Sequence, residues 1–212
     1  MKAFLAAAFV AVNLLPAGPV HSQDGERGGL FGWLRKRNSS PAREATSVRT
    51  SQDQATSANG EIEFGLGQAD IRALVDLHNQ ARREVGVEPV EWNPRLARFA
   101  QEWADELART GEFKHRPRQQ HGYGENLASG TTGSYTAASL AGQWYAEKRL
   151  FRGNPAFGRG DMPAAHYTQM IWRNTTEIGA GIAVCRTGPY RGMTILVCNY
   201  NPPGNVIGEP VH

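Results

Sequence analysis

Two segments late in the chain constrain the fold more than any other part of the sequence. Residues 177–186 (EIGAGIAVCR) and 193–201 (MTILVCNYN) alternate in polarity and are rich in β-branched side chains. The intervening TGPYRG has the glycines and the proline of a turn. Together they predict an antiparallel β-hairpin, and residues 122–130 (GYGENLASG) predict one shorter strand. Other elements must cover the apolar surface of such a sheet.

Two helices are predicted upstream of these strands. Residues 69–85 carry apolar side chains three and four positions apart, which is the spacing of one helix face. A second helix is expected to begin after Asn93, a suitable N-cap, with Pro94 at its first position. Gly111 is expected to end it.

Two more helices are predicted between the strands. One runs from about residue 136 to 150 and places Glu147 on the same side as Trp144. The other is short, begins near Pro163 and includes AHYTQM. Helices and antiparallel strands within one domain of roughly 140 residues predict the α+β class, with helices covering a sheet.

The first 66 residues differ in character from the rest. Residues 1–22 have a lysine followed by an apolar run, typical of a secretory signal peptide cleaved after Ser22. The run is short for a bilayer span, although a retained anchor is the alternative. Residues 23–66 are rich in Ser, Thr, Arg, Gln and Gly, which predicts a disordered linker and a folded domain at 67–208. Residues 28–37 (GGLFGWLRKR) would suit weak contact with a membrane surface or belong to the solvated linker.

Charge and cysteine content narrow the functional classes. The net charge of +3 is modest and the basic residues are scattered, so nucleic acid is not an expected partner. A signal peptide implies an extracellular or periplasmic location, where the two cysteines, Cys185 and Cys198, would form one disulfide. We expect a monomer.

The common metal and nucleophile motifs are missing from the sequence. It contains no His-Glu-x-x-His, Cys-x-x-Cys, Gly-x-Ser-x-Gly or phosphate-binding loop. If both cysteines are oxidised, no thiol nucleophile remains. The candidates that remain are histidines and glutamates, namely His78, His115, His121, Glu125, Glu147 and His166.

Four segments carry a family resemblance. They are HNQAR at 78–82, GENL at 124–127, HYTQMIWRNTT at 166–176 and ILVCNYNPPGNV at 195–206. In this order they resemble the motifs of the CAP superfamily, which comprises cysteine-rich secretory proteins, antigen five and pathogenesis-related proteins. The resemblance implies a three-layer α-β-α sandwich around an antiparallel sheet. It also implies a cleft lined by two histidines and two glutamates.

The resemblance assigns the four cleft residues by their motifs. His166 opens HYTQ, Glu125 is the acid of GEN, and Glu147 lies in QWYAE. His115 corresponds to the first histidine, and His121, which is closer to Glu125, is its rival. The family's usual glycine before the motif histidine is replaced by Ala165, and the low cysteine count favours a bacterial-type member.

The chemistry of these residues leaves several functions open. His115 and His166 could bind zinc or another divalent transition metal weakly, with Glu125 and Glu147 holding the second ring nitrogens. No cofactor is required. The simplest alternative is that Glu147 and His166 form a buried pair that joins two helices to the sheet.

Three functions follow from the resemblance. The first is a binding module for a small apolar ligand, such as a sterol or fatty acid, or for an extracellular protein. The second is a metal-assisted or acid–base peptidase, and the third is a scaffold without an active cleft. The lack of a nucleophile favours binding over hydrolysis.

The other motif residues are interpreted as structural. His78, Asn79 and Arg82 are expected to bind the backbone of nearby loops, because buried polar side chains usually satisfy neighbouring groups. Residues 201–205 (NPPGN) should form a turn after the last strand. Tyr167 and Trp172 should lie in the core.

We predict that removal of residues 23–65 leaves the domain folded, because their composition provides no core. The melting temperature of the shortened chain should equal that of the chain without the deletion. A decrease of several degrees would show that the segment docks on the domain.

Overall fold

The computed structural model describes residues 62–63, 65–117 and 122–212, which belong to one compact unit. The predicted signal peptide, residues 23–61 of the predicted linker and His121 lie outside the described residues. Within the described ranges, no helix is both long enough and apolar enough to cross a membrane.

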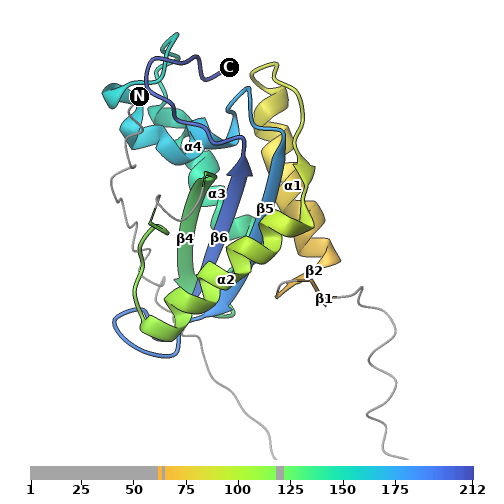
Figure 1. The fold of residues 1–212 in the computed structure, drawn as a ribbon, viewed down its shortest axis with the longest axis vertical. Helices are drawn as coiled ribbons and strands as arrows, with labels where there is room; N and C mark the ends of the chain where they lie inside the picture. Colours follow the sequence, from red (N-terminus) through yellow and green to blue (C-terminus); the bar gives the residue numbers. More distant parts are fainter. Residues whose placement is uncertain (1–61, 64, 118–121) are drawn as a thin grey trace, which may run out of the picture. The chain divides into compact units, whose positions relative to one another are not determined.

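A four-stranded sheet forms the middle of the domain, in the order β3-β5-β6-β4 (Figure 1). The predicted hairpin is confirmed, since β5 and β6 pair antiparallel, and β4 pairs antiparallel with β6. The strand β3 was not predicted and adds a parallel edge beside β5. The strands are β3 (Glu91–Trp92), β4 (Gly124–Thr131), β5 (Glu177–Val184) and β6 (Met193–Asn201), with β1 (Ile62–Glu63) and β2 (Leu66–Gly67) in a separate small sheet.

Helices cover both faces of this sheet, which confirms the α+β class and the α-β-α layering. Helix α2 crosses one face, and α1, α3 and α4 lie on the other (Figure 1). The third predicted helix is shorter than expected, because a 3-10 turn replaces its last residues. The helices are α1 (Gln68–Arg83), α2 (Pro94–Thr110), α3 (Ala137–Ala146) and α4 (Ala165–Met170), with 3-10 helices η2 (Glu147–Leu150) and η3 (Arg159–Ala164).

Helix α2 has the predicted ends and lies unusually close to the sheet. The Asn93 side chain accepts hydrogen bonds from the N–H groups of Arg95 and Leu96, and Gly111 ends the helix with a φ of 73°. Two glycines of β5, Gly179 and Gly181, face α2. A Cβ atom at either position would overlap the helix backbone, so the strand alternates glycine on this face with larger side chains on the other.

The predicted disulfide between Cys185 and Cys198 is wrong. The N–H of Cys185 bonds the carbonyl of Met193, whereas Cys198 lies opposite Ala180. Five residues along β6 therefore separate the cysteines, a distance of roughly 17 Å at the usual rise per residue, whereas bridged Cα atoms lie within about 7 Å. The two side chains also pack on opposite faces of the sheet, and both thiols are free and buried.

Unfolding the purified protein in denaturant without reductant should expose two titratable thiols per chain, because neither cysteine can reach the other in this register. A thiol-reactive chromophore measures the count. A count near zero would mean that the register of the hairpin differs from the one described.

Candidate functional site

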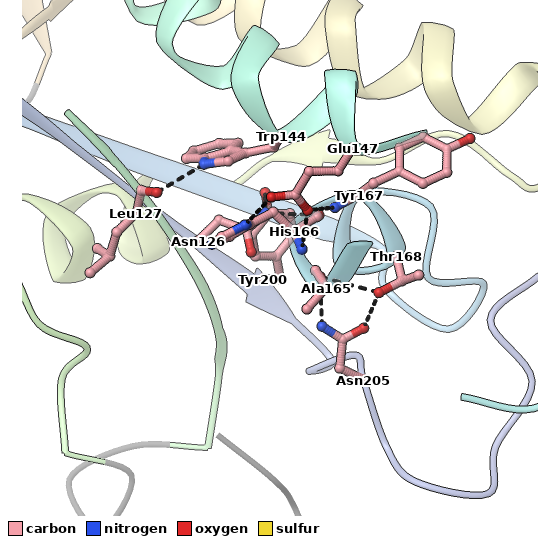
Figure 2. Close-up of polar contacts among 10 residues, drawn as sticks. All are labelled: Asn126, Leu127, Trp144, Glu147, Ala165, His166, Tyr167, Thr168, Tyr200 and Asn205. Atoms are coloured by element: carbon pink, nitrogen blue, oxygen red, sulfur yellow. Dashed lines mark hydrogen bonds and ion pairs between the residues drawn. The ribbon is translucent and has the colours of Figure 1, made fainter. Parts of the chain in front are cut away.

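Glu147 and His166 form a hydrogen-bonded pair where α3 meets α4 (Figure 2). His166 Nδ1 lies 2.6 Å from Glu147 Oε1, and the His166 N–H donates to Oε2 over 3.0 Å. A carboxylate oxygen accepts in this contact, so Nδ1 is the donor and Nε2 is the ring nitrogen left outside the pair. Among the described residues, no hydrogen-bond partner of Nε2 is found. The Tyr167 N–H also donates to Oε2, so one carboxylate both orients the ring and satisfies the first turn of α4.

Trp144 and Asn126 hold His166 from the sheet side. The Trp144 ring stacks on the imidazole with an interplanar angle of 22°, and its Nε1–H donates to the Leu127 carbonyl over 2.9 Å. Asn126 Nδ2 donates to the His166 carbonyl over 3.1 Å. Figure 2 shows the bond from Asn126 of β4 to His166, and the bond by which Trp144 of α3 is held to Leu127 of β4. The Trp144 ring therefore restricts the plane of the His166 imidazole, and Asn126 restricts the position of the His166 backbone.

The remaining polar residues of α4 bind the segment that follows β6. Thr168 Oγ1 donates to Asn205 Oδ1 over 2.7 Å, and Asn205 Nδ2 donates to the Ala165 carbonyl over 2.7 Å (Figure 2). The Gly204 N–H donates to Gln169 Oε1. The expected turn at residues 201–205 is thus tied to α4. Tyr167 and Trp172 are buried in the core, as predicted.

His115 and Glu125 form a second pair. His115 Nδ1 lies 2.8 Å from Glu125 Oε1, which also accepts from the Arg116 N–H over 3.0 Å. Two contacts hold this loop against α2. The guanidinium carbon of Arg116 lies 3.7 Å from the centre of the Phe99 ring, and Trp103 Nε1–H donates to the carbonyl of Lys114. His121 lies outside the described residues, so the choice between the two histidines remains a prediction.

The two pairs flank the edge strand β4 near one end of the sheet. Successive side chains of a strand point to opposite faces. Leu127 packs in the cluster beneath α2, so Glu125 faces α2, while Asn126 faces α4 and contacts His166. Within the described ranges, no group of three or more His, Cys, Asp or Glu side chains could hold a metal ion. The convergence of His115 and His166 on one ion remains a prediction.

A buried polar network behind His166 was not anticipated. His78 Nδ1–H donates to the Leu74 carbonyl over 2.7 Å, and the Tyr200 hydroxyl donates to His78 Nε2 over 2.9 Å. Asn126 Nδ2 in turn donates to the Tyr200 oxygen over 3.0 Å. Desolvation by burial lowers the pKa of His78 to about 4 and raises that of Tyr200 well above its usual value. Both groups therefore stay neutral, as the network requires.

Asn79 and Arg82 bind loop backbone as predicted, whereas His78 binds a helix carbonyl and a tyrosine. Asn79 exchanges two hydrogen bonds with the backbone of Val90. Burial lowers the Arg82 pKa to about 10, which leaves the side chain charged at neutral pH. Its guanidinium donates to the carbonyls of Glu88, Met170, Trp172 and Thr175.

Comparison with known proteins agrees with this fold and with the motif positions. The model of the Cysteine-rich secretory protein family (CAP) matches residues 75–200, and the chain belongs to this family. Pathogenesis-related protein 1C of Nicotiana tabacum is 40% identical over 135 residues, which cover 64% of this chain and 76% of that protein. This relative is a plant protein, so it gives no support to the expected bacterial type.

Solved structures show the same fold. NaASP2, crystallised with Zn²⁺, gives a TM-score of 0.61 at 23% identity and covers 72% of this chain and 90% of its own. BmVAL-1 gives a TM-score of 0.59 at 24% identity, and the match covers 69% of this chain and 83% of BmVAL-1. At these identities the likeness concerns the fold alone.

Stability should depend on pH through His78. The folded protein keeps this ring neutral down to a pKa of about 4, while the unfolded chain protonates near 6.5, so protons bind preferentially to the unfolded chain between these values. The contribution is fully present above pH 6.5 and is lost as the pH falls to 4, a decrease of about 3 kcal/mol.

Denaturant unfolding at several pH values measures this loss. A His78→Gln variant should show a shallower decrease between pH 6.5 and 4, whereas the exposed His212→Gln variant should keep the full decrease. An unchanged slope in His78→Gln would contradict the assignment.

Proposed function

We propose that this protein is a secreted, extracellular binding module that takes up a small apolar ligand, such as a sterol or fatty acid, or docks on a protein partner. A divalent transition metal bound weakly through His166 and His115 modulates that binding. The observation that carries the proposal is the His166–Glu147 pair. The Glu147 carboxylate occupies His166 Nδ1 and accepts from the His166 N–H at the start of α4, so Nε2 is directed away from that backbone.

The donor set fits such an ion. Neutral imidazoles suit zinc and copper, and metal-binding histidines commonly donate their other N–H to a carboxylate. Both pairs have this arrangement at Nδ1, so Glu125 and Glu147 would orient the rings without binding the ion. Structural zinc sites use four protein ligands and catalytic ones commonly three, so two imidazoles imply weak, reversible binding. When bound, the ion would supply a local positive charge.

Binding is favoured over hydrolysis by the groups that the described residues offer. They contain no set of three metal ligands, which a catalytic zinc commonly needs. Both thiols are buried, and burial raises the Cys198 pKa to about 12, so this thiol is not a nucleophile at neutral pH. The hydrolase alternative would have to use the same histidines and glutamates without a third metal ligand and without a reactive thiol among the described residues.

Two exposed apolar residues lie in segments next to the His166–Glu147 pair and are compatible with an apolar ligand or partner. Leu150, in the 3-10 helix that Glu147 begins, is 44% exposed. Ile207 is 37% exposed and follows the loop that Asn205 ties to α4. Val184 is the third large exposed hydrophobic residue of the described chain, in the strand β5. Singly exposed apolar side chains are common on proteins, so these residues offer apolar surface to a ligand or partner without marking a site by themselves.

Calorimetric titration with zinc tests the metal component, and His166→Ala should abolish binding. Glu147→Gln should weaken it by about 10–100-fold, the usual effect of losing a partner of a metal-binding histidine. Glu106→Gln, which removes an exposed carboxylate paired with Arg109 on α2, is the matched control and should bind as wild type.

The histidine variants also decide between the two candidates for the second ligand. His115→Ala should abolish binding and His121→Ala should not. Zinc binding that survives His166→Ala would exclude the metal proposal. Binding that is lost in His121→Ala but kept in His115→Ala would identify His121 as the second ligand. Native mass spectrometry of the secreted protein, before and after delipidation, would show a bound sterol or fatty acid directly.

A further inference from the structure

Two buried oxygens near the His115–Glu125 pair have no hydrogen-bond partner among the described residues. They are Glu125 Oε2, on a side chain that is 5% exposed, and Asn199 Oδ1, in a residue that is 0% exposed. The other polar atoms of both side chains are used. Glu125 Oε1 accepts from His115 and Arg116, and Asn199 Nδ2 donates to the Gly124 carbonyl over 3.0 Å. That last bond sets the orientation of the amide, because an oxygen in place of Nδ2 would face another oxygen.

The sheet register places these two side chains side by side. Glu125 on β4 lies directly opposite Asn199 on β6. The carbonyls of Leu127 and Ser129 point away from β6 and accept hydrogen bonds from side chains of α3. Glu125 lies two positions before Leu127 and has the same orientation. It therefore belongs to a non-hydrogen-bonded pair with the residue opposite on β6. In such pairs the Cα atoms are only about 4.5 Å apart and the side chains share one face. Here that face is the one beneath α2.

Two buried acceptors on paired residues of one sheet face both require a donor. Neither a carboxylate nor an amide oxygen can donate to the other, and both have lost their contact with bulk water. Calcium takes six to eight oxygen ligands, which this pair does not offer. A buried water needs only two to four polar partners. We propose that Glu125 and Asn199 hold one buried water molecule, which donates a hydrogen bond to Glu125 Oε2 and another to Asn199 Oδ1.

This water makes Asn199 a positioning residue for His115. It holds the Glu125 carboxylate from one side while His115 Nδ1–H and the Arg116 N–H hold it from the other. The next residue of β6, Tyr200, points to the opposite face and bonds Asn126, which contacts His166. Adjacent residues of one strand thus support both histidines, and this inference holds whether or not a metal binds.

A crystal structure of the wild-type protein, at a resolution that shows ordered water, tests the site itself. The expected result is density about 2.7–3.2 Å from both oxygens. Three results would overturn the proposal: no density between the side chains, an Asn199 amide turned so that Nδ2 contacts Glu125, or a peak with the short distances and anomalous signal of a metal ion.

Asn199→Leu tests the positioning role, with Asn126→Leu as the matched buried asparagine on the other face. The readout is the proton resonance of each imidazole Nδ1–H, which reports its hydrogen bond to the carboxylate. Asn199→Leu should shift or broaden the His115 signal and leave that of His166, whereas Asn126→Leu should do the reverse. Equal effects of Asn199→Leu on both signals, or no effect on the His115 signal, would refute the positioning role of Asn199. If Asn199→Leu does not fold, the presence or absence of water density in the wild-type crystal structure decides.

Discussion

A fully buried guanidinium must have its N–H groups satisfied, and Arg82 obtains this from four backbone carbonyls. One acceptor belongs to the loop after α1, and the other three follow or end α4. The charge therefore binds α1 to the chain around α4, and α4 carries His166. Because leaving a buried charge unpaired costs several kcal/mol, this contact restricts where α4 can lie. The orientation of the His166 ring then depends on shorter-range contacts with Glu147 and Trp144.

Local patterns predicted most of the fold. The apolar spacing of α1, the Asn93 cap and Gly111 end of α2, and the alternation of β5 and β6 are properties of short segments, and each was confirmed. The failures were non-local. Two residues are too few for a pattern, so β3 was missed, and the cysteine pairing was wrong because it depends on the hairpin register. A shift in register determines which residues face each other and on which side.

The candidate site shows the same division. His115, Glu125, Glu147 and His166 were all candidates from the residues, and the resemblance assigned the four to one cleft. The structure forms the pairs His115–Glu125 and Glu147–His166. The network of His78, Tyr200 and Asn126 joins segments 122 and 74 residues apart, which no local pattern reveals. One signal was present, since a histidine on the apolar stripe of α1 must find a buried partner. Its identity required the sheet.

The alternation of β6 explains how one strand can serve two histidines on different faces of the sheet. Asn199 faces α2 and lies opposite Glu125, while Tyr200 faces α1 and binds both His78 and Asn126. A strand is stiff along its length, so the two faces keep a constant relation to each other. His115 itself lies in the loop before β4 and His166 on α4, so β6 acts on the two histidines only through the side chains that support them. β6 thus joins the supports of the two pairs, while the ring of His166 is oriented by Glu147 and Trp144 and that of His115 by Glu125.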